Sequence, residues 1–351
     1  MNKKEYFEYV GALHVHTKYS DGSGSIKKIV KEAKKANLDY VITSDHNNIK
    51  AVKDGAEGRY DDLLLLVGEE IGVKWSEHYL AVGINEPIKP DKKNYNVRTH
   101  IEEVKNQGGL GFIAHPYGLK KSLFRLNIAS WNSWDDPNYD GIEIWSYMHD
   151  WSRHVNIFNI IYRYINPRKV ISGPPEHILK KWDELCQNRR VIGIGALDVH
   201  AKYVFPFVMI QFLSYRRTFN TVRTHVLTSS PLNQDLNASK KMLYDSLKAG
   251  HCFFADDYLA NSKGFRFEAV LDDKYLIMGD EQKMSGKANL LIETPLPSTI
   301  RLIKDGQVLI KEKSCNLITE TRDFGVYRVE ARIDDKPWIY SNPIYLRPQI
   351  Q

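Results

Sequence analysis

The sequence contains little cysteine, no long apolar run and no dense run of basic residues. Its three cysteines, Cys186, Cys252 and Cys315, lie far apart and in no metal-ligand spacing. A sparse, odd-numbered set excludes a disulfide-stabilised scaffold and indicates a reducing compartment, so we expect a cytoplasmic protein. No segment reaches the roughly 18 uninterrupted apolar residues of a membrane helix, and Met1–Val10 lacks the apolar region of a signal peptide. We therefore expect no membrane partner.

Charge is nearly balanced along the chain. There are 49 basic and 43 acidic residues, which give a net charge of +6. Because the basic residues form no cluster, a solvated basic surface is the ordinary interpretation. Attraction of a small anionic substrate is the alternative, and a nucleic acid partner is not expected. The content of 42% hydrophobic and 26% charged residues is typical of globular proteins and excludes a disordered, collagen-like or coiled-coil chain.

The chain divides into two parts with different hydrophobic patterns. In the first part, short apolar segments such as Asp39–Thr43 and Leu63–Val67 alternate with helical patterns, one of them expected over residues 151–165. Short strands that are apolar on both faces predict a parallel sheet covered by helices, open or closed into a barrel. From Lys263 onward, short alternating segments and hairpin signals predict a small antiparallel β-sandwich. We therefore expect one domain over residues 1–262 and a second over residues 263–351.

Residues able to bind metals are concentrated in the first part, where they follow the ends of expected strands. All twelve histidines lie between His14 and His251. Because the carboxyl ends of parallel strands meet at one side of a sheet, residues that follow them are expected to converge. These residues are His14, His16, Asp21, Asp45, His46, Glu69, Glu70, His115, Asp198 and His200. Each alone has an ordinary explanation as a loop, capping or solvated residue, but so many at one rim predict a metal site.

The ligand types indicate which metals this site would take. Imidazole and carboxylate without thiolate suit Zn²⁺, Mn²⁺ or Fe²⁺. A set of this size exceeds the needs of one ion, so we expect two or three divalent ions. Ions about 3.5–4 Å apart share a water molecule, lower its pKa and hold it for attack on a phosphoryl or acyl centre.

The motifs that carry these residues resemble those of the PHP (polymerase and histidinol phosphatase) family. They are His14-Val-His16 followed by Asp21-Gly, Thr43-Ser-Asp-His46, Gly68-Glu-Glu70 followed by His78, Ala114-His115-Pro, and Leu197-Asp198-Val-His200. They occur in the family's order, over roughly residues 8–255. The resemblance implies a distorted (β/α)7 barrel with a trinuclear metal site, and hydrolysis of phosphomonoesters or phosphodiesters.

The resemblance also implies how the residues divide among three ions. Glu70 would bridge the first and second ions, and it is preferred to Glu69 because the family pattern is Gly-x-Glu. The three sets are His14, His16, Glu70 and Asp198 for the first ion; Glu70, His78 and His115 for the second; and Asp21, His46 and His200 for the third. All nine positions carry acceptable ligands, so the site is expected to be functional.

We therefore expect a metal-dependent hydrolase, and first of all a phosphoesterase that acts on a small organic phosphate mono- or diester. A hydroxide bridging the first two ions would attack, with Glu70 and Asp198 as the catalytic carboxylates that hold these ions. The segment Gly68–His78 also resembles a branch of the family that includes carbamate hydrolases. Carbamate, ester or amide hydrolysis is therefore the first alternative, and a non-catalytic metal-containing binding protein is the second.

Several residues outside these motifs have two interpretations. His251 follows Ala249-Gly250 and is a candidate rim residue that protonates a leaving group. His149 and Arg153 follow the segment Gly141–Trp145 and either line the mouth of the barrel or lie on a helix surface. The C-terminal part resembles a domain found behind some PHP domains. We expect it to provide structural support or oligomerisation, with ligand or partner binding as the alternative.

Overall fold

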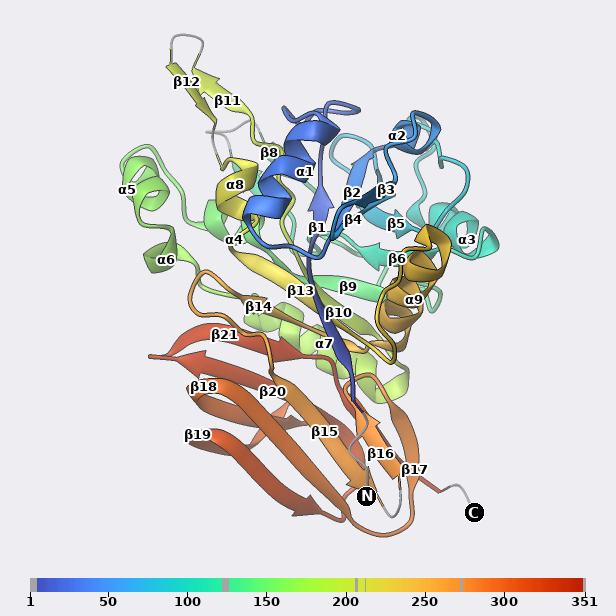
Figure 1. Ribbon diagram of the computed structural model, residues 1–351, viewed down its shortest axis with the longest axis vertical. Coiled ribbons are helices and arrows are strands. Elements are labelled where there is room, and N and C mark those ends of the chain that lie inside the picture. Colours follow the sequence, from blue (N-terminus) through green and yellow to red (C-terminus); the bar gives the residue numbers. More distant parts are fainter. Residues whose placement is uncertain (1–4, 122–125, 206–207, 212, 272–273, 350–351) are drawn as a thin grey trace.

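Seven strands form a closed barrel in the computed structural model, which describes residues 5–121, 126–205, 208–211, 213–271 and 274–349 (Figure 1). In order around the barrel they are β1 (Phe7–Val15), β2 (Tyr40–His46), β4 (Leu63–Ile71), β5 (Tyr79–Val82), β6 (Leu110–Ile113), β9 (Gly141–Ser146) and β10 (Ile192–Ala196). All adjacent pairs are parallel except those of β5, which runs antiparallel to β4 and β6. The predicted distorted seven-stranded barrel is thus confirmed, and β5 is its main distortion.

The barrel closes where the chain after β10 meets β1. The Leu197 amide donates to the Leu13 carbonyl at 3.0 Å, and the His16 amide donates to the Val199 carbonyl at 3.0 Å. Alternate strand residues such as Ile42 and Phe112 fill the interior, where α9 adds Leu243. The interior of the barrel is therefore apolar, and the buried polar residues gather at the carboxyl ends of the strands.

Helices surround the barrel and connect its strands. They are α1 (Ile26–Lys35), α2 (Lys50–Lys53), α3 (Val97–Asn106), α4 (Tyr147–Arg153), α5 (Ile160–Ile165), α6 (Pro167–Val170), α7 (Glu176–Asn188), α8 (Tyr215–Thr218) and α9 (Leu236–Ala249). The prediction of one helix over residues 151–165 is wrong. α4 begins earlier, at Tyr147, and residues 154–159 between α4 and α5 are not helical. Asn156 Oδ1 accepts hydrogen bonds from the amides of Phe158 and Asn159, which satisfies this backbone without a helix.

The C-terminal part consists mainly of antiparallel strands around a hydrophobic core of its own. They are β15 (Arg266–Leu271), β16 (Lys274–Ile277), β17 (Glu281–Met284), β18 (Ala288–Lys304), β19 (Gln307–Thr321), β20 (Gly325–Ile333), β21 (Lys336–Ser341) and β22 (Ile344–Pro348). The β18–β19 hairpin turns at Asp305 and Gly306, whose φ angles are 49° and 80°, as an Asp-Gly turn of this type requires. The chain also forms short hairpins. They join β3 (Gly58–Tyr60) to β4, β7 (Leu119–Lys121) to β8 (Leu126–Ile128), and β11 (Tyr203–Phe205) to β12 (Val208–Gln211).

A hydrogen-bonded ladder joins the barrel to the C-terminal strands. β13 (Val222–Thr228) pairs with the first half of β1 and with β14 (Cys252–Asp256), and β14 pairs with β21. Phe253 of β14 packs in the C-terminal core. The division at residue 262 stays a prediction, and the β13–β14 hairpin is shared between the two parts. All three cysteines are free. None of the described helices is long and apolar enough to span a membrane.

A buried ion cluster at this junction contains His225 on β13. His225 Nδ1 lies 2.8 Å from Glu8 Oε1, and His225 Nε2 lies 3.1 Å from Asp257 Oδ2. Burial alone would lower the pKa of His225, but the charges of Asp257 and Glu8 outweigh it and raise this pKa to about 9. Arg223 pairs with Asp257 and Arg266 with Glu8, so both carboxylates remain ionised beside the histidine.

The free energy of unfolding is expected to fall as the pH rises through about 9, because folded His225 then loses its proton. Its contribution is complete below the unfolded-state pKa of about 6.5 and amounts to about 3 kcal/mol. Urea unfolding of the wild type and of His225→Gln, at equal metal content between pH 6 and pH 10, measures the difference. The gap between the two proteins should narrow with rising pH, and a constant gap would contradict the assignment.

Candidate metal centre

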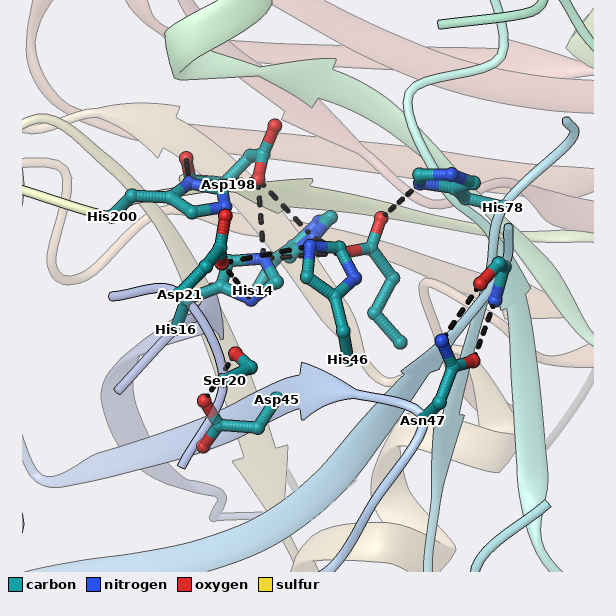
Figure 2. Close-up of polar contacts among 12 residues, drawn as sticks. His14, His16, Ser20, Asp21, Asp45, His46, Asn47, His78, Asp198 and His200 are labelled. Atoms are coloured by element: carbon teal, nitrogen blue, oxygen red, sulfur yellow. Dashed lines mark hydrogen bonds and ion pairs between the residues drawn. The ribbon is translucent and has the colours of Figure 1, made fainter. Parts of the chain in front are cut away.

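The nine predicted ligands come together at one end of the barrel, where the carboxyl ends of the parallel strands and the amino end of β5 lie. Figure 2 labels His14, His16, Asp21, His46, His78, Asp198 and His200 among them. Ligand atoms form four groups, and within each group they lie within 4.8 Å of one another. The groups are His14, His16, Glu70 and Asp198; Glu70, His78 and His115; His16, Asp21, His46 and His200; and His115, His149 and Asp198. We call these the first, second, third and fourth clusters. The first two contain the residues expected for the first two ions, and the third adds His16 to the expected set.

The first cluster is built from two nitrogens and two oxygens. The distances from His14 Nε2 and His16 Nε2 to Glu70 Oε2 are 3.3 and 3.2 Å. The distances from the same nitrogens to Asp198 Oδ1 are 3.4 and 3.3 Å. All four side chains are buried. The four atoms therefore face one small volume, in an arrangement that suits a divalent ion.

Glu70 connects the clusters because its two oxygens face different partners. Oε2 belongs to the first cluster and also lies 3.0 Å from His46 Nδ1. Oε1 lies 2.8 Å from His78 Nδ1 and 3.0 Å from His115 Nε2 in the second cluster. In the third cluster, Asp21 Oδ1 lies 3.1 Å from His200 Nε2. One carboxylate is thus placed to serve two ions.

Unpaired polar atoms support the interpretation as a metal centre. Among the described residues, His14 Nε2, His16 Nε2 and Glu70 Oε2 are buried without a hydrogen-bond partner. Unsatisfied buried polar atoms are costly, and metal coordination would satisfy all three. The residues therefore fit divalent ions.

The carboxylates of the centre are held in the ionised form. Burial acts to raise the pKa values of Glu70 and Asp198, but the surrounding histidines, beginning with His14, lower both well below their ordinary values. Burial lowers the pKa of His46 and of His115 to about 4, so both rings are neutral near pH 7. The neighbouring carboxylates raise the pKa values of His14, His16 and His78, so these rings release protons when a metal binds, because neutral imidazoles and ionised carboxylates are the forms that bind metals.

The backbone at three ligands adopts the left-handed region. The φ angles are 60° at His14, 28° at His115 and 51° at Asp198. β1 contains an irregularity at this point, between Ala12 and Val15. Such conformations cost on the order of 1–3 kcal/mol each and are found at functional sites. The strand ends are therefore bent to aim these side chains into the centre.

Two buried residues that the sequence analysis did not assign to the centre support it. Glu143 on β9 places Oε2 2.8 Å from His14 Nδ1 and accepts a hydrogen bond from the His115 amide at 3.3 Å. His149 on α4 places Nε2 3.1 Å from Asp198 Oδ2 and stacks on the His115 ring at 4.3 Å between centroids. His149 is fully buried, so its interpretation as a helix-surface residue is wrong. A lone carboxylate inside the apolar segment Gly141–Trp145 was the signal available for Glu143.

The remaining candidates lie outside the clusters. Asp45 accepts hydrogen bonds from Thr17 and from Ser20 Oγ, which fixes the loop between His16 and Asp21 (Figure 2). Glu69 Oε2 accepts from the Ile88 amide, and burial raises the pKa of Glu69 to about 8. His251 lies directly before β14, and its Nε2 is 2.8 Å from Asp280 Oδ1. The structure therefore does not bring this candidate proton donor to the centre.

Replacing Glu143 by glutamine is expected to weaken metal binding by about 10- to 100-fold, the usual effect of losing a carboxylate partner of a ligating histidine. The carboxylate holds the proton on His14 Nδ1 and leaves Nε2 free for the metal, whereas glutamine can present its amide NH₂ instead. Titration with Zn²⁺ in competition with a chelator measures the affinity. Unchanged affinity in a correctly folded Glu143→Gln protein would show that Glu143 does not orient His14.

Parts of the chain are similar to known proteins. Residues 12–123 match the family model of the PHP domain. A protein of Methanocaldococcus jannaschii, described as uncharacterised, is 29% identical over 154 residues, which cover 39% of this chain and 81% of that protein. A two-domain protein from Bacteroides vulgatus, with a predicted PHP-like metal-dependent phosphoesterase, is similar over 96% of this chain and 95% of its own, at 16% identity and a TM-score of 0.41. Endonuclease Q in complex with duplex DNA is similar over 67% of this chain and 57% of its own, at 14% identity and a TM-score of 0.40.

The matched segment contains seven of the nine ligands, namely His14, His16, Asp21, His46, Glu70, His78 and His115. The match to the PHP domain model thus falls on the part of the chain whose motifs resemble that family, and it includes most of the ligands of the buried centre.

Proposed function

We propose that the protein is a phosphoesterase that hydrolyses a small organic phosphate mono- or diester. The observation that carries this proposal is the shared position of Glu70, whose two oxygens face the first and second clusters. Two or three ions of Mn, Fe or Zn, held by the nine predicted ligands, would polarise a phosphoryl oxygen and lower the pKa of a water molecule. His149 is proposed as an additional residue of the centre because it contacts Asp198.

The chain's own residues hold the carboxylates of the first cluster in the form that binds metals. Glu70 and Asp198 remain ionised, and Glu143 orients His14. The side chain of Asp21 is 41% exposed, so the third cluster faces the solvent from which a substrate arrives. Lys202 Nζ lies 2.6 Å from Asp21 Oδ2 at the same edge and adds positive charge for an anionic substrate.

The proposed partner is a small molecule rather than a nucleic acid, because the sequence contains no dense basic run. We retain the cytoplasm as the proposed location. For residues 263–351 we propose structural support of the barrel, because Asn342 from this part reaches into the barrel sheet. Its Oδ1 accepts from the Gly193 amide at 2.7 Å, and its Nδ2 donates to the Cys252 carbonyl at 2.8 Å.

Metal content and product analysis test the proposal together. Protein purified without a metal-affinity tag should contain two or three equivalents of Mn, Fe or Zn by elemental analysis. Phosphate should then be released from small phosphate esters, with carbamates, carboxylic esters, amides and duplex DNA assayed in parallel. Release of an alcohol or amine without phosphate would replace the proposal by the carbamate, ester or amide alternative. Full metal occupancy without turnover of any substrate would favour a binding protein.

A further inference from the structure

A cleft of about 920 Å³ lies beside the metal centre. Its lining side chains include Trp75, Tyr117, Leu119, Ile128, Arg153 and His177. Trp75 precedes His78 by three residues, Tyr117 follows His115 by two, and Arg153 follows His149 by one helical turn of α4. The segments that carry the ligands of the second and fourth clusters therefore also form the walls of this cleft.

Tyr117 lines the cleft and contacts a residue of the fourth cluster. Its ring lies edge-on to the His149 ring, with 5.6 Å between centroids, and His149 contacts Asp198. The Tyr117 hydroxyl donates to the Ser146 carbonyl at 3.2 Å, which fixes the ring in this position. A group bound in the cleft would consequently lie against Tyr117, which contacts His149 of the fourth cluster.

Aromatic and aliphatic surface forms much of the cleft. The Trp75 side chain is 59% exposed, although tryptophan usually buries most of its area. Leu119 and Ile128 come from the β7–β8 hairpin. Flat apolar surface of this kind suits an aromatic ring.

Arg153 supplies a cation with unused donors. Its guanidinium lies 5.4 Å from the centroid of the Tyr117 ring. Its Nη2 donates to the Gly173 carbonyl at 3.3 Å, and its Nε is buried without a hydrogen-bond partner within the described part of the chain. Its Nη2 lies 3.9 Å from Asp150 Oδ1, and Asp150 already accepts from the Gly173 amide and the Trp145 indole.

The other charged groups of the cleft do not neutralise Arg153. The Glu176 side chain is 82% exposed and pairs with Lys180 at 3.0 Å. Burial and the charge of Arg153 lower the pKa of His177, so His177 is neutral near pH 7. Arginine with free donors recognises carboxylate or phosphate groups in two-point contacts.

We propose that this cleft binds the leaving group of the substrate and selects an aromatic group that carries a second negative charge, with Arg153 as the specificity-determining residue. The inference rests on the proposed phosphoesterase function and names its substrate class. The scissile phosphate would lie at the metal centre, the ring between Trp75 and the β7–β8 hairpin, and the second anion at Arg153.

The test compares 4-carboxyphenyl phosphate with phenyl phosphate as substrates. The ratio of their kcat/KM values is expected to fall by about tenfold or more in Arg153→Gln, with kcat/KM for phenyl phosphate little changed. Arg153→Lys, which keeps the charge without the two-point geometry, should give an intermediate ratio. Arg322→Gln, at an exposed arginine of the C-terminal part, is the matched control and should keep the wild-type ratio. Equal metal content in all proteins excludes an indirect effect on the centre.

A binding measurement separates failure of this inference from failure of the proposed function. Calorimetric titration of the metal-loaded protein with 4-carboxyphenylphosphonate, which is not hydrolysed, should show about tenfold weaker binding to Arg153→Gln. Turnover of both phosphates with a ratio that Arg153→Gln leaves unchanged would overturn the cleft assignment and leave the phosphoesterase standing. Binding that depends on Arg153 without turnover of any phosphate would support the cleft and overturn the phosphoesterase.

Discussion

Replacement of Asp198 by alanine is expected to remove metal from the first cluster and to lower phosphoester hydrolysis by roughly a thousandfold or more. Asp198 is buried and ionised, and its Oδ1 lies 3.4 and 3.3 Å from the ligating nitrogens of His14 and His16. Without Asp198, Glu70 is the one carboxylate left beside His14 and His16 in the first cluster. Metal-assisted stabilisation of developing charge is worth several kcal/mol, and each 1.36 kcal/mol corresponds to about tenfold in rate.

Elemental analysis and phosphate-release assays on the same preparation measure both effects of Asp198→Ala. Asp198→Asn keeps the volume and removes the charge, so it should behave like alanine if charge is what matters. Glu69→Gln is the matched control, because Glu69 lies one residue before Glu70 on β4 but bonds to the Ile88 amide outside the centre. It should keep its metal and its activity. Normal metal content and full activity in Asp198→Ala would overturn the ligand assignment.

Replacement of Asp183 by alanine is expected to lower the free energy of unfolding by about 3–5 kcal/mol. Asp183 on α7 receives a two-point contact from Arg328 on β20, with Nε–Oδ1 at 2.5 Å and Nη2–Oδ2 at 2.8 Å. Both side chains are buried, and Glu330 Oε1 accepts from Arg328 Nη1 at 2.8 Å. Without Asp183, part of the guanidinium would stay buried without an acceptor, which costs more than the pair itself contributes.

Urea unfolding of the metal-loaded protein measures the effect of Asp183→Ala. Glu184→Ala is the matched control on the same helix, because Glu184 is exposed and pairs with Lys181 at the surface. Its free energy of unfolding should stay within about 0.5 kcal/mol of the wild type. If the two variants are equally stable, the buried pair does not join the barrel to the C-terminal strands as the structure indicates.

The sequence predicted the candidate site best where the topology of the sheet determines the position of a residue. Residues such as His14, His46 and His115 lie at the ends of different strands, and the rule that parallel strands end at one side of a sheet predicts that they converge. Glu143 and His149 could not be found in this way, because one lies inside an apolar strand and the other inside a helix. Their role depends on side-chain direction, which the hydrophobic pattern does not specify.

The contacts between the two parts of the chain could not be predicted from the sequence either. Pairing of β14 with β21 joins Phe254 to Tyr340. The sequence of neither strand specifies the other as its partner, because the same alternation of apolar residues suits any neighbouring strand of a sheet. The left-handed φ of His14 and Asp198 likewise follows from the closure of the barrel, and neither residue type requires it.

The ladder from β13 through β14 to β21 has a consequence for how this protein can be divided. A fragment ending at residue 262 would leave β14 as an open edge, with its backbone amides and carbonyls unpaired along Phe253–Ala255. It would also uncover Phe253 and Ala255, which pack in the C-terminal core. An exposed apolar edge pairs with strands from other molecules, so the isolated barrel part is expected to aggregate. The C-terminal strands cover this edge and thereby protect the barrel sheet from such pairing.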